Sequence, residues 1–289
     1  MSAFIRNIGQ VSKAESIKLG SRFGRRTLGG KHFRNIGPLR GVSAAAGFTC
    51  DAADYDGTND WLLRGAGLTG AADGSQGIFS CWVRLDAKDI TNFLFSIKNG
   101  VAGTVEVKIN TDNQFDIDVR DVTRALILSG RATTTILTTA TWYHLIVSWD
   151  TNFGAGSKLL KMVINGTTQT MTIEDVSIAF NIDYTGVESG VGNRADALVL
   201  LNGCLAEVYF NSVTYLDVTQ AANLAKWRTV GGKPENLGAD GSTPTGTAPI
   251  VYQRMADGAA ATTFATNLGG GGDYTITGTL DTCSSSPSD

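Results

Sequence analysis

Apolar and polar residues alternate one by one through much of the segment from residue 48 to about 211. The clearest case is Trp142–Trp149, in which every second residue from Tyr143 is large and apolar. A period of two residues places successive side chains on opposite faces of an extended chain, so it predicts half-buried β-strands. Strands without helices between them predict two stacked antiparallel sheets. The expected strands are 78–85, 92–98, 104–109, 114–119, 124–129, 142–149, 158–164, 167–173, 188–193 and 197–211.

Turn residues support this all-β sandwich. The chain has 35 Gly and only 5 Pro, which is typical of many short strands joined by tight turns. The Asn165-Gly166 pair predicts a hairpin between 158–164 and 167–173, because these residues accept the positive φ angles of a type I′ turn. A second Asn-Gly pair, at 202–203, predicts a break in the last strand.

One short helix is expected near 217–229. Asp217 and Gln220 occupy capping-box positions, and apolar residues recur at helical spacing until the Gly231-Gly232 pair ends the pattern. The rest of the chain is expected to form a loop-rich extension, with a surface loop at 233–249 and short apolar pieces near 250–253 and 274–276.

The first 41 residues differ in charge from everything that follows. They contain nine Lys or Arg and a single acid, Glu15, which gives a charge near +8. Because the whole chain sums to −3, the remaining 248 residues carry about −11. Frequent glycines leave no helix or strand pattern here, so we expect a basic extended arm at 1–47 and the sandwich at 48–289.

Three interpretations of the arm are open. It is a solvated chain end, a nucleic-acid-binding segment, or an assembly arm that becomes ordered on another protein. Basic residues alternate with more apolar side chains than a solubilising tail needs, and the acidic domain would repel a polyanion. We therefore favour a protein partner over nucleic acid. The residues expected to bind that partner are Arg6, Arg22, Phe23, Arg25, Arg26, Arg34 and Arg40.

The sequence also bears on location and redox state. No stretch approaches 18 consecutive apolar residues, and the N-terminus lacks the pattern of a secretory signal, so we expect synthesis in the cytoplasm and no membrane span. Cys50, Cys81, Cys204 and Cys283 lie far apart without CxxC spacing, which argues against zinc and a dense disulfide framework. We expect reduced core thiols; a Cys81–Cys204 bridge would need neighbouring strands in suitable register.

Two groups of residues are candidates for ligand binding. Asp54, Asp56 and Asp60 could converge on calcium, although the alternative is that they shape a turn by bonding local backbone. A weaker calcium candidate is the pair at 181 and 183. Sugars stack on exposed aromatic rings, whereas large aromatic residues in strands more often fill cores. The candidate stacking residues are Trp61, Trp82 and Trp142, while His144, Trp149 and Trp227 are expected to be packed in cores.

Several segments together resemble laminin G-like, concanavalin A-like jelly rolls. The glycine- and proline-containing ending is also similar to the tails of lectin-like domains in bacteriophage virion proteins. The resemblance covers roughly residues 48–289 and none of the arm. The segments are Asp54-Tyr55-Asp56-Gly57-Thr58-Asn59-Asp60-Trp61-Leu62, Phe79-Ser80-Cys81-Trp82-Val83-Arg84, Trp142-Tyr143-His144-Leu145, Gly203-Cys204-Leu205-Ala206-Glu207-Val208-Tyr209, Gly231-Gly232-Lys233-Pro234, Leu237-Gly238-Ala239-Asp240-Gly241-Ser242 and Ser286-Pro287-Ser288-Asp289.

The resemblance implies a phage virion structural protein, a capsid decoration or a tail-associated protein. Its lectin-like domain would be displayed outward, and its arm would join other virion proteins and further copies of the chain. The alternative is a receptor-recognition module of a tail fibre that binds a host-surface glycan. A third interpretation is a glycan-cleaving enzyme. Because this fold serves all three roles, residues must decide between them.

The residues favour a protein without catalysis. Glycosidases that the domain resembles carry Glu-x-Asp-x-x-Glu on one strand, which places carboxylates on one face. This chain has no such string; Glu106, Glu188 and Glu207 stand alone in sequence. Glu174 and Asp175 are adjacent, so a strand would point them to opposite faces. We therefore expect no catalytic residues and no cofactor.

Overall fold

The computed structural model describes residues 47–289, apart from 101, 137, 155–156, 177 and 196–198. Residues Gly47–Asp289 form one compact unit. The predicted arm, with all its basic residues, lies outside the described residues. Among the described residues, no helix is long and apolar enough to cross a membrane.

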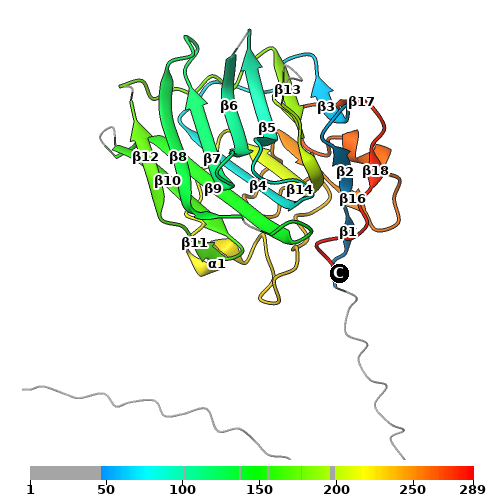
Figure 1. Ribbon diagram of the computed structural model, residues 1–289. Helices are drawn as coiled ribbons and strands as arrows, with labels where there is room; N and C mark the ends of the chain where they lie inside the picture. Colours follow the sequence, from blue (N-terminus) through cyan, green and yellow to red (C-terminus); the bar gives the residue numbers. More distant parts are fainter. Residues whose placement is uncertain (1–46, 101, 137, 155–156, 177, 196–198) are drawn as a thin grey trace, which may run out of the picture. The chain divides into compact units, whose positions relative to one another are not determined.

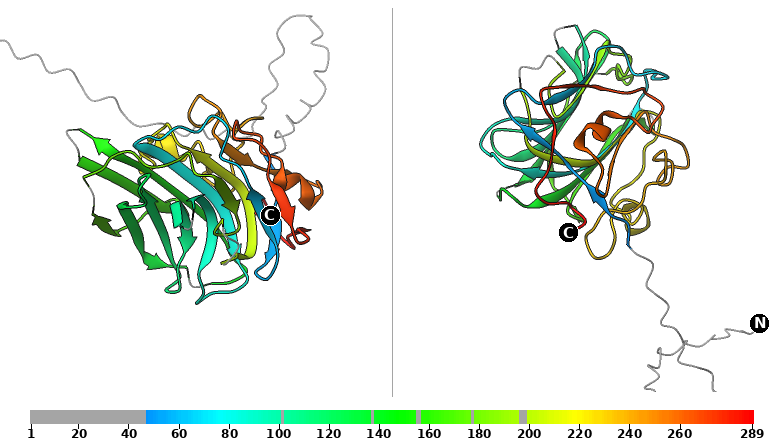
Figure 2. Two further views of the ribbon diagram at one scale, coloured as in Figure 1. Left: turned by 90° about the horizontal axis from the view of Figure 1, so that it is seen from above. Right: turned by 90° about the vertical axis from the view of Figure 1, so that its right-hand side faces the viewer.

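The domain is the predicted sandwich of two antiparallel sheets (Figures 1 and 2). We call them the covered sheet and the open sheet. The covered sheet has the order β11 (Thr167–Thr168), β10 (Ser157–Ile164), β9 (Trp142–Phe153), β4 (Gln76–Leu85), β14 (Asn202–Asn211), β2 (Ala53–Asp56) and β18 (Asp281–Thr282), with β15 (Val251–Gln253) also paired to β14. The open sheet has the order β12 (Met171–Asp175), β8 (Leu126–Thr135), β7 (Gln114–Arg120), β6 (Ala102–Ile109), β5 (Asn92–Asn99), β13 (Glu188–Val191), β3 (Trp61–Arg64) and β17 (Thr275–Thr277).

The main core lies between the two sheets. Every second residue of β4 faces it, and so do alternate residues of β6 and β7, as the sequence pattern predicts. Aromatic rings join the layers: Phe95 of the open sheet lies 5.8 Å from Phe79 and 4.8 Å from Phe210, both of the covered sheet. The short helix η1 (Ala261–Ala265) buries Phe264 in the same core. A small third pair, β1 (Cys50–Asp51) with β16 (Met255–Ala256), completes the domain.

The predicted hairpin at 158–173 is correct in its first strand, its turn and the first two residues of its second strand. Asn165 and Gly166 have φ of 49° and 81°, as a type I′ turn requires. The returning strand stops after Thr168, however, and the chain crosses to the other sheet, where β12 pairs with β8. Period-two alternation cannot distinguish one seven-residue strand from two short strands in different sheets.

A β-bulge at Glu207 changes which side of β14 faces the main core. Glu207 has a φ of 49°, and the register between β14 and β4 shifts between Ala206 and Tyr209. Before the bulge Leu205 faces the main core, whereas after it Val208 and Phe210 do. The extra residue of a bulge reverses the alternation, so Cys204 and Phe210 lie on opposite faces of the sheet although an even number of residues separates them.

The predicted helix at 217–229 is also too long. The α-helix α1 comprises only Ala221–Leu224. Asp217 does cap a turn, because its carboxylate accepts hydrogen bonds from the backbone and hydroxyl of Thr219, but that turn precedes the helix. After α1 the chain bends so that Trp227 packs edge-on against Tyr209, with ring centroids 4.6 Å apart. This packing ends the helix earlier than helix propensity alone indicates.

The chain after β14 covers the outer face of the covered sheet. Two further apolar clusters lie in this second interface. One joins Ile78 and Ile146 of the sheet to Trp227 and Leu237 of the covering segment. The other surrounds Trp82 and is made of Cys50, Ala52, Cys204, Ala206 and Cys283, with Phe48 and Trp142 packed against it.

A disulfide joins the covering segment to the sheet. It links Cys204 of β14 to Cys283, which follows β18. The expectation of four reduced thiols is therefore wrong for these two residues, and only Cys50 and Cys81 are free and buried. The alternative Cys81–Cys204 bridge is wrong as well: Cys81 faces the main core, whereas Cys204 faces the covering segment.

Candidate functional site

The outer face of the open sheet carries charged side chains where the covered sheet carries apolar ones. In β6 and β7, the odd-numbered residues enter the main core. The even-numbered residues therefore face outward, because side chains alternate along a strand. On β6 they include Glu106 and Lys108, and on β7 Asp118 and Arg120. Glu106 lies directly opposite Asp118 in the ladder, so the sheet itself gathers these charges.

These four side chains form one ion-pair network. Lys108 Nζ lies 2.7 Å from Asp118 Oδ2 and 3.6 Å from Glu106 Oε2. Arg120 contacts the same two carboxylates, at 3.4 Å from Glu106 Oε2 and 3.5 Å from Asp118 Oδ2. The four side chains are between 13% and 22% exposed. Each charge holds its neighbours in place, so the face presents donors and acceptors in fixed positions.

Burial and charge act in opposite directions on the two β7 carboxyl groups. Burial favours the neutral form of Asp118, but the charges of Lys108 and Arg120 and hydrogen bonds from Lys108 and Ser129 outweigh it and lower its pKa. For Asp116, burial is dominant and raises the pKa, although Lys108 and Arg131 oppose it. Asp118 is therefore held as a carboxylate.

A hollow lies beside the network, toward the edge of the sheet. Its volume is about 170 Å³, and it is lined by Gln114, Ser129, Arg131, Thr172 and Glu174. Arg131, 47% exposed, donates from Nε and Nη2 to Oδ2 of Asp116, both at 3.1 Å.

The other carboxylate oxygen of Asp116, Oδ1, is buried and accepts no hydrogen bond. An unpaired buried acceptor is a position where an ordered water molecule would be held. The face itself combines charged donors and acceptors, and the hollow adds the polar side chains of Gln114, Ser129 and Thr172. Such a set suits a ligand with many hydroxyl groups, since each hydroxyl both donates and accepts.

The three tryptophans predicted to stack on sugars do not form one platform. Trp82 is 3% exposed and stacks on His144, with centroids 4.8 Å apart, beneath the covering segment. Trp142 is half-buried there, and its Nε1 donates to Ser285 Oγ at 3.1 Å. Trp61 lies on the open sheet, in β3, two strands beyond β5. Core packing is thus the outcome for Trp82, and His144, Trp149 and Trp227 are buried as predicted.

The three aspartates of the calcium hypothesis use their oxygens in different places. Asp56 Oδ1 accepts the backbone N–H of residues 58, 59 and 60, at 2.7–3.3 Å. Asp60 accepts from the backbone of Asp56 and Thr279. These bonds are those of the alternative, in which the cluster shapes the turn. Asp54 lies apart, near Asp86 and the sulfur of Cys204. That sulfur is in the disulfide and cannot act as a thiolate ligand.

In the weaker calcium candidate, the pair at 181 and 183, the carboxylate is also hydrogen-bonded within the protein. Asp183 is buried; its carboxylate accepts hydrogen bonds from Thr185 and from Asn99 Nδ2, at 2.8–3.0 Å. Asn181 is exposed and lies one residue before the isolated bridge that Ile182 makes with Gly74.

Sequence reasoning missed the charged network because it examined acids as neighbours in sequence. Glu106, treated as an isolated acid, is joined to Asp118 by the pairing of β6 with β7. A signal was present: both predicted strands carry charges at alternate positions, 106 and 108 in one and 116, 118 and 120 in the other. A strand with apolar residues on one face and only charges on the other indicates an outer face that the chain itself does not cover.

The chain matches no protein-family profile and no curated protein. Three solved structures illustrate what the chain is similar to. A proposed carbohydrate-binding protein from Bacteroides ovatus has a TM-score of 0.54 and 14% identity, over 83% of this chain and 62% of that one. A heptameric SAP-like pentraxin from Limulus polyphemus has a TM-score of 0.46 and 14% identity, over 61% and 82%. Domains LG4-5 of the mouse laminin α1 chain have a TM-score of 0.40 and 11% identity, over 59% and 43%.

The Bacteroides protein shows the fold, and this chain spans less than two thirds of it. The sheet order and this similarity agree with the jelly-roll fold that the resemblance implies. The described domain has the fold of a laminin G-like, concanavalin A-like jelly roll.

Proposed function

We propose that the domain is a non-catalytic glycan-binding module and that the outer face of the open sheet is its binding surface. The observation that carries this proposal is the organised set of hydrogen-bonding groups on that face, beside a hollow lined by Gln114, Ser129, Arg131, Thr172 and Glu174. Sugar hydroxyls are both donors and acceptors, so they fit alternating carboxylates and guanidinium groups. The similar Bacteroides structure, itself a proposed carbohydrate-binding protein, supports the same class of ligand.

The charges also favour binding over hydrolysis. A glycosidase needs one carboxylic acid that can donate a proton and a second carboxylate at a suitable distance. Here Glu106 and Asp118 share the cations Lys108 and Arg120, and the pKa of Asp118 is lowered. A carboxylate held in this way is a poor proton donor at neutral pH.

A glycan array with the arm-free domain 47–289 tests the proposal, followed by titration of the best ligand. We expect binding without turnover, and at least tenfold weaker binding by Arg131→Ala. The matched control is Lys88→Ala, which removes an exposed cation outside this face. Equal affinity of wild type and Arg131→Ala would contradict the assignment of the face, and released sugar would contradict the absence of catalysis.

We further propose that the arm attaches the domain to a virion as a capsid decoration or tail-associated protein. The charge contrast supports this role, since a segment near +8 is joined to a domain of about −11. A basic arm can approach an acidic neighbouring subunit that the domain itself would not attract. Ordering such an arm costs roughly 1–2 kcal/mol per residue, so its apolar residues must be buried by the partner. Many displayed copies would add avidity to weak sugar binding.

Incorporation into particles tests the virion role separately from sugar binding. We expect the chain without residues 1–46 to fold and bind glycan normally but to be missing from purified particles. Normal occupancy of the shortened chain would contradict the role of the arm and leave the glycan proposal intact.

A further inference from the structure

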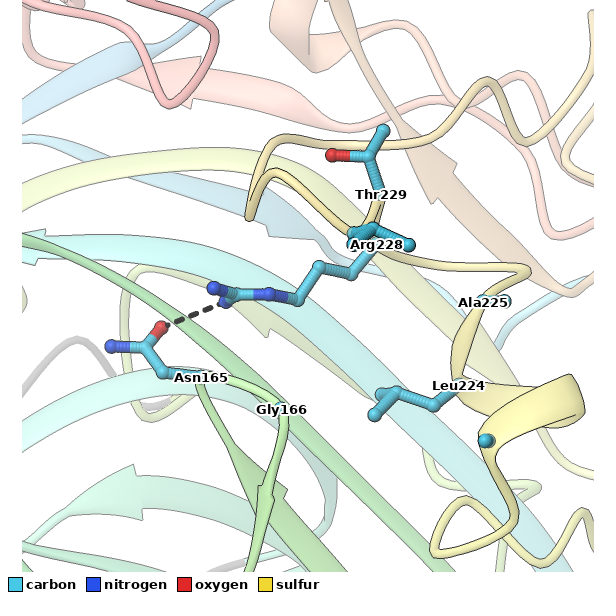
Figure 3. A pocket seen from close by; sticks show the side chains of 8 residues that line it. Asn165, Gly166, Leu224, Ala225, Arg228 and Thr229 are labelled. Carbon is cyan, nitrogen blue, oxygen red and sulfur yellow. Dashed lines mark hydrogen bonds between the residues drawn. The ribbon is translucent and has the colours of Figure 1, made fainter. Parts of the chain in front are cut away.

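A second hollow lies on the other side of the domain, between the β10–β11 turn and α1. Its volume is about 290 Å³. Asn165 and Gly166 of the turn form one wall, and Leu224 with the neighbouring alanines of α1 forms an apolar wall opposite (Figure 3). Arg228 extends between the two walls, and its guanidinium group points toward Asn165.

The guanidinium group of Arg228 is fixed by contacts on several sides. Its Nη1 donates to Oδ1 of Asn165 at 3.2 Å, and its central carbon, Cζ, lies 5.5 Å from the ring centre of Trp82. The backbone of Gly232 is so close that a Cβ atom there would lie 2.6 Å from Nη2. Gly232 has a φ of 81°, a backbone conformation that favours glycine. The hydrogen bond to Asn165 and the ring of Trp82 orient the guanidinium group before any ligand arrives.

This cation has no acidic partner among the described residues. No carboxylate of the described part lies within ion-pair distance of Arg228, although most other cations of the domain pair with an acid. His144, next to Trp82, is neutral, because burial and the nearby Arg228 lower its pKa to about 3, so it adds no second positive charge to this region. Burial also lowers the pKa of Arg228. A partly desolvated guanidinium without a counter-charge attracts an anion from solution more strongly than an exposed, paired one.

We propose that this hollow binds the oxyanion of an acidic sugar, a carboxylate or a sulfate ester, at Arg228. A planar guanidinium group matches a carboxylate or sulfate with two parallel hydrogen bonds. The hollow is at the small end of ligand sites, which suits a single sugar unit. Its apolar wall, made of Leu224, Ala221 and Ala225, would contact the carbon skeleton of that unit. The inference does not depend on the proposed function, because the two sites lie on different sheets.

Titration of the domain 47–289 with glucuronate, inorganic sulfate and glucose at constant ionic strength tests the inference. The readout is the amide resonances of Gly166 and Gly232 in ¹⁵N-labelled protein. We expect glucuronate to shift both resonances in a saturable way and glucose to have no effect. If sulfate binds as tightly as glucuronate, the site recognises the oxyanion alone; if glucuronate binds at least tenfold more tightly, the site recognises an acidic sugar.

Two variants separate the role of Arg228 from a loss of folding. Arg228→Gln removes the cation, and we expect at least tenfold weaker binding. Asn165→Asp retains Arg228 and the turn, since Asp also accepts a positive φ, but it supplies an internal counter-charge and should weaken binding to a similar degree. The control Lys88→Gln removes an exposed cation elsewhere and should bind normally. If glucuronate binds none of these proteins, or binds both site variants as tightly as wild type, the proposal is wrong.

Discussion

The two sheets of this domain are built from the same alternating pattern, yet their outer faces differ completely. On the covered sheet, the outward residues Ile78 and Trp82 pack beneath the chain that follows β14. On the open sheet, the outward residues Glu106 and Lys108 bind other charges and reach solvent. Alternation guarantees one buried face per sheet; the chemistry of the other face indicates whether the chain returns to cover it. A face that remains uncovered is free to bind other molecules.

The largest expected difference between the two faces comes from truncating their outward side chains. Trp82→Ala should cost about 5 kcal/mol of unfolding free energy, the upper end for a buried aromatic residue, because stacking on His144 is lost with the buried area. Ser129→Ala on the open face should cost only about 1 kcal/mol, the scale of its side-chain hydrogen bond to Asp118. Urea unfolding of both variants measures this. Similar losses in the two variants would mean that the covering segment is not packed as described.

The disulfide fastens the covering segment to the covered sheet, so its removal is the next largest change. Cys204 and Cys283 are 79 residues apart, and closing a loop of that length stabilises the folded state by about 4 kcal/mol. The variant Cys204→Ala/Cys283→Ala should lose that amount, with glycan affinity at the open face retained. Unfolding curves and titrations of this variant give both values. Loss of glycan binding in a still-folded variant would contradict the independence of the two faces.

Glu207 makes the covered side sensitive to pH. Burial raises its pKa from 4.5 to about 7, although Tyr252 and Arg254 oppose the shift. The unfolded chain therefore loses this proton near pH 4.5 and the folded chain only near pH 7, so stability falls across that interval and is level above it. Glu207→Gln should be about 3 kcal/mol more stable than wild type at pH 8 and nearly equal at pH 4.5. A constant difference between the two proteins from pH 4.5 to 8 would contradict the raised pKa.

The contribution of the open face to the free energy of unfolding should fall in acid, opposite to the effect of Glu207, and it should change less. Because the pKa of Asp118 is lowered in the folded state, its contribution is present above the unfolded value of about 3.9 and is lost as pH falls through the lower folded value. Asp118→Asn should cost about 1 kcal/mol at pH 7, the scale of a partly exposed ion pair. Thermal unfolding from pH 7 into acid checks this, since the difference between the two proteins should shrink as Asp118 is protonated. A difference that stays constant as the pH falls would point to a cause other than charge.

Local sequence patterns predicted the strands and the turn. Which residues come together on the outer face of each sheet could be seen only in the folded structure. The Asn165-Gly166 turn and the strand at 142–149 depend on residues that are neighbours in sequence, and both are correct. Glu106 lies beside Asp118 only because β6 pairs with β7. Cys204 lies beside Cys283 only because the end of the chain returns to the covered sheet. The bulge at Glu207 reversed the alternation without a glycine to mark it.

We propose that neutral glycans bind at the open face and not at the segment that covers the other sheet. Mapping the amide shifts of the ¹⁵N-labelled domain 47–289 with a neutral glycan selected on the array tests this directly. We expect shifts confined to β6, β7, β8 and β12, the strands that carry the charged network and its hollow. Shifts confined to the covering segment after Asn211, with none in these four strands, would contradict it.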